Sequence, residues 1–213
     1  MVALLLVGAT SFAQDPAPLT AVRPHASTPN DDAPDAGAAR RAAKFLLGGA
    51  AGLGLHEGGH VLFDGLFGVE PTLKKVDFGG IPFFAITHRS GLPRRQEFTI
   101  TSAGFWMQHL SSEIILARHP RLRDERAPTL KGVLAFNVLA SVAYGMAAMA
   151  KAGPVERDTR AMADALRGNE AWVGGLVLAP AGLDGWRYFH PDARWATWVS
   201  RGVKIGMVLL VLR

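Results

Sequence analysis

Long apolar segments occupy most of the chain beyond about residue 43. Four of them approach or exceed the roughly 20 residues that a helix needs to cross a hydrocarbon core. They lie at about 43–67, 98–117, 130–150 and 172–186. A fifth segment, 195–212, contains Arg201 and Lys204 and is therefore also suited to the membrane interface. The pattern predicts a mostly α-helical, polytopic membrane bundle with about four to five membrane segments.

The pattern changes between the first two apolar segments. Residues 70–97 are rich in β-branched and aromatic residues, and Gly79, Gly80 and Pro82 interrupt them. We expect a small β-hairpin there, lying on the membrane surface. Such a hairpin could bind an extended peptide by strand addition, or it could simply connect two helices. The polar residues 154–170 predict an amphipathic helix outside the bilayer.

The first 41 residues differ from the rest of the chain. Residues 1–13 combine a short apolar run with Ser11-Phe12-Ala13, which is typical of a signal peptide and its cleavage site. Residues 14–41 are rich in Pro, Ala, Asp and Thr without apolar periodicity, which indicates a disordered linker. The sequence therefore predicts an exported N-terminus, this linker and a membrane-embedded domain over residues 42–213.

Composition narrows the chemistry that the chain can use. Hydrophobic residues make up 49% of its 213 positions, and the mean hydropathy is +0.16. The chain has no cysteine, so a metal site must use His, Asp or Glu. The net charge of +5 does not indicate nucleic-acid binding, because the arginines lie in short loops between apolar segments and form no stripe with aromatic residues.

The first apolar segment contains the motif His56-Glu57-Gly58-Gly59-His60. On a helix, residues four apart share one face, so His56 and His60 point the same way with Glu57 beside them. Two neutral imidazoles can hold Zn²⁺, which lowers the pKa of a bound water to about 7, and Glu57 can act as the general base. Ionisable residues within a membrane segment cost about 2 to 3 kcal/mol each and usually serve a function. The alternative is a pair of hydrogen-bonded structural histidines.

A catalytic zinc usually has three protein ligands and an open position for water. The sequence offers Asp184 in the fourth segment, and His109 and Glu113, which lie one helical turn apart in the second. Asp64 lies one turn beyond His60 and is better suited to orient that histidine from the second shell.

Two further polar residues have less direct roles. Asn137, in the third segment, is expected to donate an interhelical hydrogen bond, with stabilisation of an oxyanion as the alternative. His88 is expected at the surface rather than at the metal.

The motif at residues 56–60, together with Leu183-Asp184-Gly185, resembles the site-2 protease family of intramembrane zinc metallopeptidases. In that family a membrane-embedded HExxH is paired with a distant Leu-Asp-Gly, whose Asp completes the zinc site. The resemblance covers about residues 43–190, and Arg187 matches a basic residue that is frequent in the family. It implies that His56, His60 and Asp184 are the ligands and Glu57 the base.

The sequence departs from the family pattern at Leu176, where the family has an Asn eight positions before the Asp, and around Pro180, where the proline register is shifted. Depth is a second difficulty. If the first four segments all cross the membrane, the first and fourth run antiparallel and the two motifs are offset by about 10 Å. A re-entrant intermediate segment, or segment boundaries that differ by one turn, would remove this offset. Otherwise His109 is the alternative to Asp184 as the third ligand.

The sequence thus predicts an intramembrane zinc metalloprotease, resident in a bacterial-type inner membrane. Its expected partners are the lipid bilayer and a membrane protein that it cleaves within or beside a transmembrane segment. One alternative is a zinc-binding membrane protein without proteolytic activity, which the Leu176 departure favours. Another is a soluble or peripheral HExxH peptidase whose apolar helices form an ordinary core.

Overall fold

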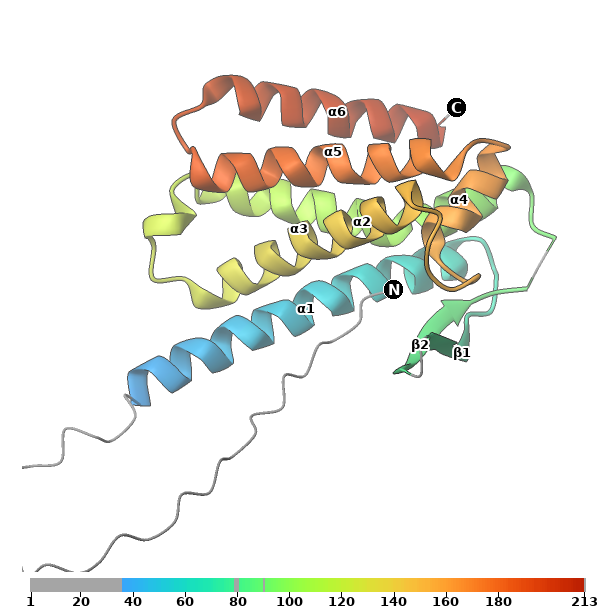
Figure 1. The fold of residues 1–213 in the computed structure, drawn as a ribbon, viewed down its shortest axis with the longest axis horizontal. Helices are drawn as coiled ribbons and strands as arrows, with labels where there is room; N and C mark the ends of the chain where they lie inside the picture. Colours follow the sequence, from blue (N-terminus) through green and yellow to red (C-terminus); the bar gives the residue numbers. More distant parts are fainter. Residues whose placement is uncertain (1–35, 79–80, 90, 213) are drawn as a thin grey trace, which may run out of the picture.

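A computed structural model of the protein describes residues 36–78, 81–89 and 91–212 (Figure 1). The predicted signal peptide and most of the predicted linker lie outside these residues. In chain order the elements are α1 (Ala36–Leu66), β1 (Thr72–Phe78), β2 (Ile81–Thr87), α2 (Arg94–Arg118), the 3-10 helix η1 (Leu122–Asp124), α3 (Pro128–Met149), α4 (Asp158–Leu166), α5 (Glu170–Phe189) and α6 (Arg194–Leu212). The mostly helical fold and the hairpin after the first helix are confirmed.

Helix α1 has 31 residues and begins earlier than the sequence pattern predicted. Residues 36–41, assigned above to a disordered linker, form its first turns. This part of the prediction was wrong. It relied on the missing apolar periodicity and overlooked the alanines of this stretch, and alanine has the highest helix propensity.

The long helices pack side by side in a fixed order (Figure 1). Helix α1 contacts α2 and α3, α3 also contacts α5, and α5 contacts α6. Gly48 of α1 and Gly132 of α3 allow this close approach, since a Cβ atom at either position would overlap backbone atoms of the other helix. The expectation that glycines let neighbouring helices pack closely is confirmed at this crossing.

Different structural elements lie at the two ends of the helical bundle (Figure 1). The C-terminal half of α1, the antiparallel β1–β2 hairpin and α4 gather at one end, called here the hairpin end. Helices α1 and α3 both begin at the opposite end, where Arg40, Arg41 and Lys131 line one pocket. This end is called here the basic end. The predicted helix within residues 154–170 is confirmed as α4, which buries Met162 and Ala163 in a core shared with α2, α3 and α5.

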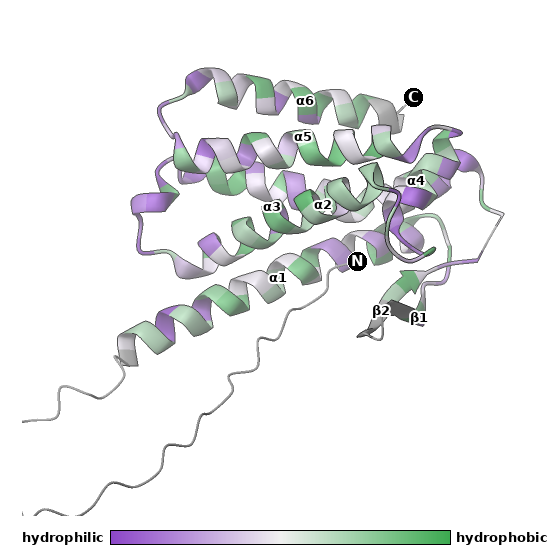
Figure 2. Cartoon of the chain, viewed as in Figure 1, coloured by the Kyte–Doolittle hydropathy of each residue, from purple (hydrophilic) through white to green (hydrophobic). Residues whose placement is uncertain are grey.

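Hydrophilic residues gather in the loops at the two ends, and the helices between them carry most of the hydrophobic residues (Figure 2). Within the described residues, only α3 is long and apolar enough to cross a membrane by length and composition. Half of its apolar window is buried, and the core helix of a soluble protein would meet the same criterion. Membrane spanning, by α3 as well as by the other helices, therefore stays a prediction.

Candidate metal centre

His56 and His60 lie one turn apart on α1 and point to the same side, as the motif spacing predicted. Both are buried, and their Nε2 atoms are 3.4 Å apart. Glycines allow helix α2 to pack closely against this part of α1. Gly104 faces the His56 ring so closely that a Cβ atom would lie 2.5 Å from it, and a Cβ at Gly59 would lie 2.7 Å from the carbonyl oxygen of Ala103.

The third donor at this place is Asp158, the first residue of α4. Its Oδ2 atom lies 3.4 Å from Nε2 of His56 and 3.7 Å from Nε2 of His60. A tetrahedral zinc ion with bonds of about 2.0 to 2.1 Å separates its ligand atoms by about 3.3 Å. The three donor atoms therefore have nearly the mutual spacing that zinc requires, and they could hold a metal ion.

The hydrogen bonding of His60 suits this role. Its Nδ1 atom is 2.8 Å from the backbone oxygen of Ile100 on α2. With the proton on Nδ1, the imidazole donates to that carbonyl and directs the lone pair of Nε2 toward His56 and Asp158. Such a second-shell partner fixes the tautomer and the ring orientation of a metal-binding histidine. Asp64 was expected to orient His60, but the partner of His60 in the structure is the backbone oxygen of Ile100.

Asp158 is held in place through both of its chain neighbours. The guanidinium of Arg157 donates to both carboxylate oxygens of Glu170, at 2.5 and 2.6 Å, and Thr159 Oγ1 donates to Glu170 at 3.0 Å. Glu170 is the first residue of α5 and is buried with Arg157. These hydrogen bonds connect the start of α4 to the start of α5. Asp158 lies in the chain between the two residues that donate them.

The carboxyl group of Asp158 is ionised at neutral pH. Burial opposes ionisation, but the adjacent His60 and the hydrogen-bonding contact with His56 hold its pKa below the usual range. An ionised carboxylate is the form that binds a metal.

Glu57 faces the same space as the metal donors. A cavity of about 20 Å³ lies there, enough for roughly one water molecule. Its lining comprises Glu57, His60, Ala85, Ile86, Tyr144, Glu156 and Asp158. The proposed base, two of the three donors and strand β2 of the hairpin thus share one cavity.

Tyr144 of α3 was not identified from the sequence. Its ring lies 5.8 Å from the His56 ring, and its buried hydroxyl has no hydrogen-bond partner among the described residues. A buried hydroxyl without a partner costs free energy, so this O–H group is a donor that a ligand in the cavity could satisfy. A tyrosine within an apolar helix gives no sequence signal that separates this role from core packing.

Asp184 does not lie with the two histidines. Its Oδ1 atom accepts hydrogen bonds from Lys204 Nζ at 2.8 Å and from Ser200 Oγ at 2.9 Å, both on α6. Helix α3 lies between α1 and α5, so the Leu-Asp-Gly of α5 faces α6 instead (Figure 1). The structure therefore corrects the third donor of this group from Asp184 to Asp158.

The two alternative ligands on α2 also lie elsewhere. Glu113 accepts from Arg187 at 2.5 Å, from Arg201 at 2.8 Å and from Lys204 at 3.0 Å. It forms an ionic cluster that joins α2, α5 and α6. His109 is buried, and its Nε2 atom has no partner within the part of the chain that the structure describes. Neither residue is among the clustered donors.

Asp64 and His88 form a separate pair beside the hairpin. Asp64 is fully buried, and its Oδ1 atom is 3.5 Å from Nδ1 of His88. Nε2 of His88 is 3.1 Å from Oε2 of Glu97. The hydrogen bond with Glu97 raises the pKa of His88, and burial opposes this. The His88 side chain is 10% exposed, so it is more enclosed than the expected surface histidine, and it is not among the clustered metal donors, as expected.

Asn137 links α3 to α2. Its amide donates to the backbone oxygen of Gln108 at 3.1 Å and to the hydroxyls of Ser111 and Ser112 at 2.8 and 3.0 Å. The predicted interhelical hydrogen bond is confirmed, and the amide donates to α2 rather than into the metal centre.

Comparisons with known proteins add no assignment to this geometry. No family model matches the chain, and neither a curated protein nor a solved structure matches it. Function is therefore argued from the donor atoms, the cavity and the surfaces of the molecule.

Proposed function

We propose that the protein is a zinc-dependent metallopeptidase that hydrolyses a peptide bond of a membrane protein within or beside the bilayer. The observation that carries the proposal is the nearly tetrahedral spacing of His56, His60 and Asp158 beside a cavity that Glu57 also lines. Two imidazoles and one carboxylate with an open fourth position form a donor set typical of zinc hydrolases. The site-2 protease resemblance agrees with this chemistry, although it implied a different aspartate.

The residues around the cavity have different roles in the proposed peptide hydrolysis. Zinc, when bound, acts as a Lewis acid that polarises the scissile carbonyl and favours loss of a proton from water. Glu57 takes that proton as the water oxygen attacks the carbonyl carbon, and it returns the proton to the leaving nitrogen. The Tyr144 hydroxyl can donate a hydrogen bond to the oxyanion that develops during the attack.

The hairpin offers a way to present the substrate. Ala85 and Ile86 of β2 line the cavity, and β2 pairs with β1 along only one edge within the described residues. An extended peptide that adds to the other edge would form backbone hydrogen bonds and pass beside Glu57. Lys74 of β1 donates to Glu156 at 2.9 Å, which ties the hairpin to the loop before α4. We infer that the hairpin is a substrate-binding edge.

Exposed apolar side chains support a membrane location. Leu46 and Leu47 on α1 are 70% and 64% exposed, and Trp198 and Leu209 on α6 are 70% and 60% exposed. Large apolar surfaces of this kind are uncommon on soluble monomers and suit contact with lipid. The competing soluble or peripheral peptidase would be released from membranes by carbonate, whereas the proposed integral protein would stay in the pellet.

The decisive experiment compares wild type with Glu57→Gln in detergent-solubilised full-length protein. Zinc is measured by elemental analysis, and cleavage is measured by mass spectrometry on a set of transmembrane peptides in micelles. We expect about one zinc per chain in both proteins and cleavage only by the wild type. A folded wild type without zinc, or equal cleavage by both proteins, would overturn the proposal.

One observation favours a zinc-binding protein without proteolytic activity. The cavity of about 20 Å³ holds roughly one water, so the centre as it stands has no room for a peptide. Catalysis therefore requires the hairpin to move away when substrate binds, because movement of α4 would withdraw the metal donor Asp158. Zinc retained at one per chain, without cleavage of any tested peptide, would establish this second function.

A further inference from the structure

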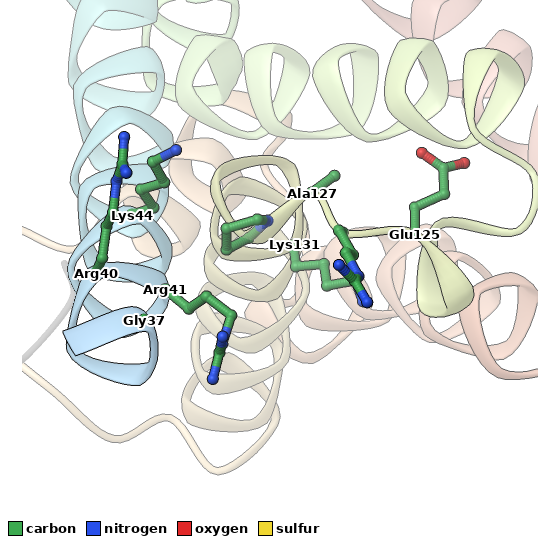
Figure 3. Close-up of a pocket in the computed structure, with 9 residues that line it drawn as sticks. Gly37, Arg40, Arg41, Lys44, Glu125, Ala127 and Lys131 are labelled. Carbon is green, nitrogen blue, oxygen red and sulfur yellow. The ribbon is translucent and has the colours of Figure 1, made fainter. Parts of the chain in front are cut away.

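The basic end of the bundle carries an open pocket of about 960 Å³, where α1 and α3 begin (Figure 3). The metal donors lie toward the hairpin end (Figure 1). Within the described part of the chain, five cationic side chains and one carboxylate line the pocket: Arg40, Arg41, Lys44, Arg126, Lys131 and Glu125. Figure 3 shows Arg40, Arg41 and Lys44 on the first turns of α1, beside Lys131 of α3. The lining therefore has a strong excess of positive charge.

The carboxylate of Glu125 does little to neutralise the charge of these cationic side chains. Oε2 of Glu125 is 2.6 Å from Nδ1 of His119, so the carboxylate is already engaged with a residue outside the lining. Ala127, the N-cap residue of α3, provides no side-chain acceptor for the first amides of that helix. The positive end of α3 therefore adds to the cationic side chains and favours a bound anion.

An apolar groove continues from this pocket. It has a volume of about 280 Å³ and lies between α1, α3 and α5. Its apolar lining includes Phe45, Leu134, Val138, Leu139, Tyr188 and Phe189. Lys131 lines both the pocket and the groove, and Phe45 directly follows Lys44. A strongly cationic site thus opens directly into a surface suited to hydrocarbon.

These two surfaces together identify the chemistry of the occupant. A free phosphate or a soluble phosphometabolite would use only the basic pocket, and a nucleic acid would leave the apolar groove empty. Along α3, Lys131 and Leu139 are separated by about 12 Å, which is most of one leaflet of a bilayer. We propose that the basic pocket and the apolar groove together bind an anionic glycerophospholipid, with the phosphate at the pocket and an acyl chain in the groove.

This site is independent of the peptidase chemistry at the hairpin end. It places the starts of α1 and α3 at the headgroup level of one leaflet and directs the groove into the acyl region. Basic residues near an anionic surface each strengthen binding by about fivefold. Removal of three of them should therefore weaken binding by about a hundredfold.

The test uses full-length protein in a neutral detergent, with short-chain phosphatidylglycerol, short-chain phosphatidylcholine and inorganic phosphate as separate ligands. Binding is measured by microscale thermophoresis. The basic-pocket variant is Arg40→Gln, Lys44→Gln, Arg126→Gln. The matched control, Lys75→Gln, Arg89→Gln, Arg94→Gln, removes the same charges from exposed positions outside the pocket. The groove variant is Leu139→Gln, at a side chain that is 67% exposed and can change without unfolding the protein.

We expect phosphatidylglycerol to bind wild type and the control variant equally, and phosphatidylcholine to bind at least tenfold more weakly. The basic-pocket variant should lose about a hundredfold in affinity for phosphatidylglycerol, and Leu139→Gln should lose several-fold. Inorganic phosphate that binds as tightly as phosphatidylglycerol, with no effect of Leu139→Gln, would overturn the lipid assignment in favour of a phosphate site. Equal binding of the two lipids would overturn the proposal, and zinc content would be unaffected in every case.

Discussion

Nε2 of His56 and Oδ2 of Asp158 lie 3.4 Å apart although 102 positions separate the two residues in the chain. Helix α4 therefore brings a carboxylate to the HExxH motif, and it does so from a short polar segment outside the long helices. The ion pair of Arg157 and Glu170 fixes where that segment begins. The metal centre consequently depends on how α4 is fastened to α5.

Substitution of the third donor separates the two candidate aspartates. We expect Asp158→Ala to weaken zinc binding by more than about a hundredfold, which exceeds the usual effect of losing a second-shell partner. Asp184→Ala should keep the wild-type affinity, since its carboxylate binds Lys204 and Ser200. Zinc retained by each variant after dialysis against graded chelator checks this. Loss of zinc in Asp184→Ala alone would restore the site that the family resemblance implied.

Gly104 offers a test of the packing around His56. A Cβ atom at this position would lie 2.5 to 2.6 Å from three atoms of the imidazole ring. In Gly104→Ala we therefore expect His56 to be displaced and zinc affinity to fall at least tenfold.

The matched control for Gly104→Ala is Gly58→Ala, within the motif itself, where a Cβ meets nothing within 4 Å. That control should keep zinc and gain about 0.5 to 1 kcal/mol of stability, because alanine favours a helix. Equal zinc affinity in the two variants would show that His56 does not need the space that Gly104 leaves. Chelator competition and thermal unfolding give the two readouts.

The sequence was sufficient to predict the parts of the site that follow from local geometry. His56 and His60 share a face because they are four residues apart on a helix, and Glu57 follows from the same motif. The hairpin followed from β-branched residues broken by Gly79, Gly80 and Pro82. These features need no knowledge of how distant segments pack.

The remaining parts depend on tertiary contacts that leave little local signal. Asp158 lies in a segment predicted as an external amphipathic helix, and its role follows from the Arg157–Glu170 pair and from burial of Met162. Asp184 matched a family motif, but α3 separates its helix from α1. Its polarity within an apolar run is explained by Lys204 and Ser200.

His88 predicts a pH dependence of stability beside the hairpin. Contact with Glu97 raises the pKa of His88 in the folded state above its unfolded value, so protonated His88 stabilises the fold. That contribution is complete below the unfolded pKa of about 6.5 and is lost as pH rises through the higher folded pKa. The group facing it on α1 is Asp64, 3.5 Å away, which also favours the protonated form.

The corresponding measurement is thermal unfolding of wild type and His88→Gln between pH 6 and pH 9, the range about the reference pKa of histidine. The wild type should lose stability relative to the variant as pH rises, so that the two curves converge at high pH. A constant difference between them would show that His88 does not change its charge in this range.

Tyr144 provides the sharpest test of the proposed chemistry, because its hydroxyl has no partner among the described side chains and backbone groups. Tyr144→Phe removes only that oxygen and leaves the ring that packs 5.2 Å from the Phe105 ring. Since no hydrogen bond is lost, we expect stability and zinc content equal to or slightly above those of the wild type. If the hydroxyl donates to the oxyanion, kcat should fall by about a hundredfold with KM little changed, as when an oxyanion donor is removed. Unchanged kcat on the transmembrane peptides would show that Tyr144 acts only in packing.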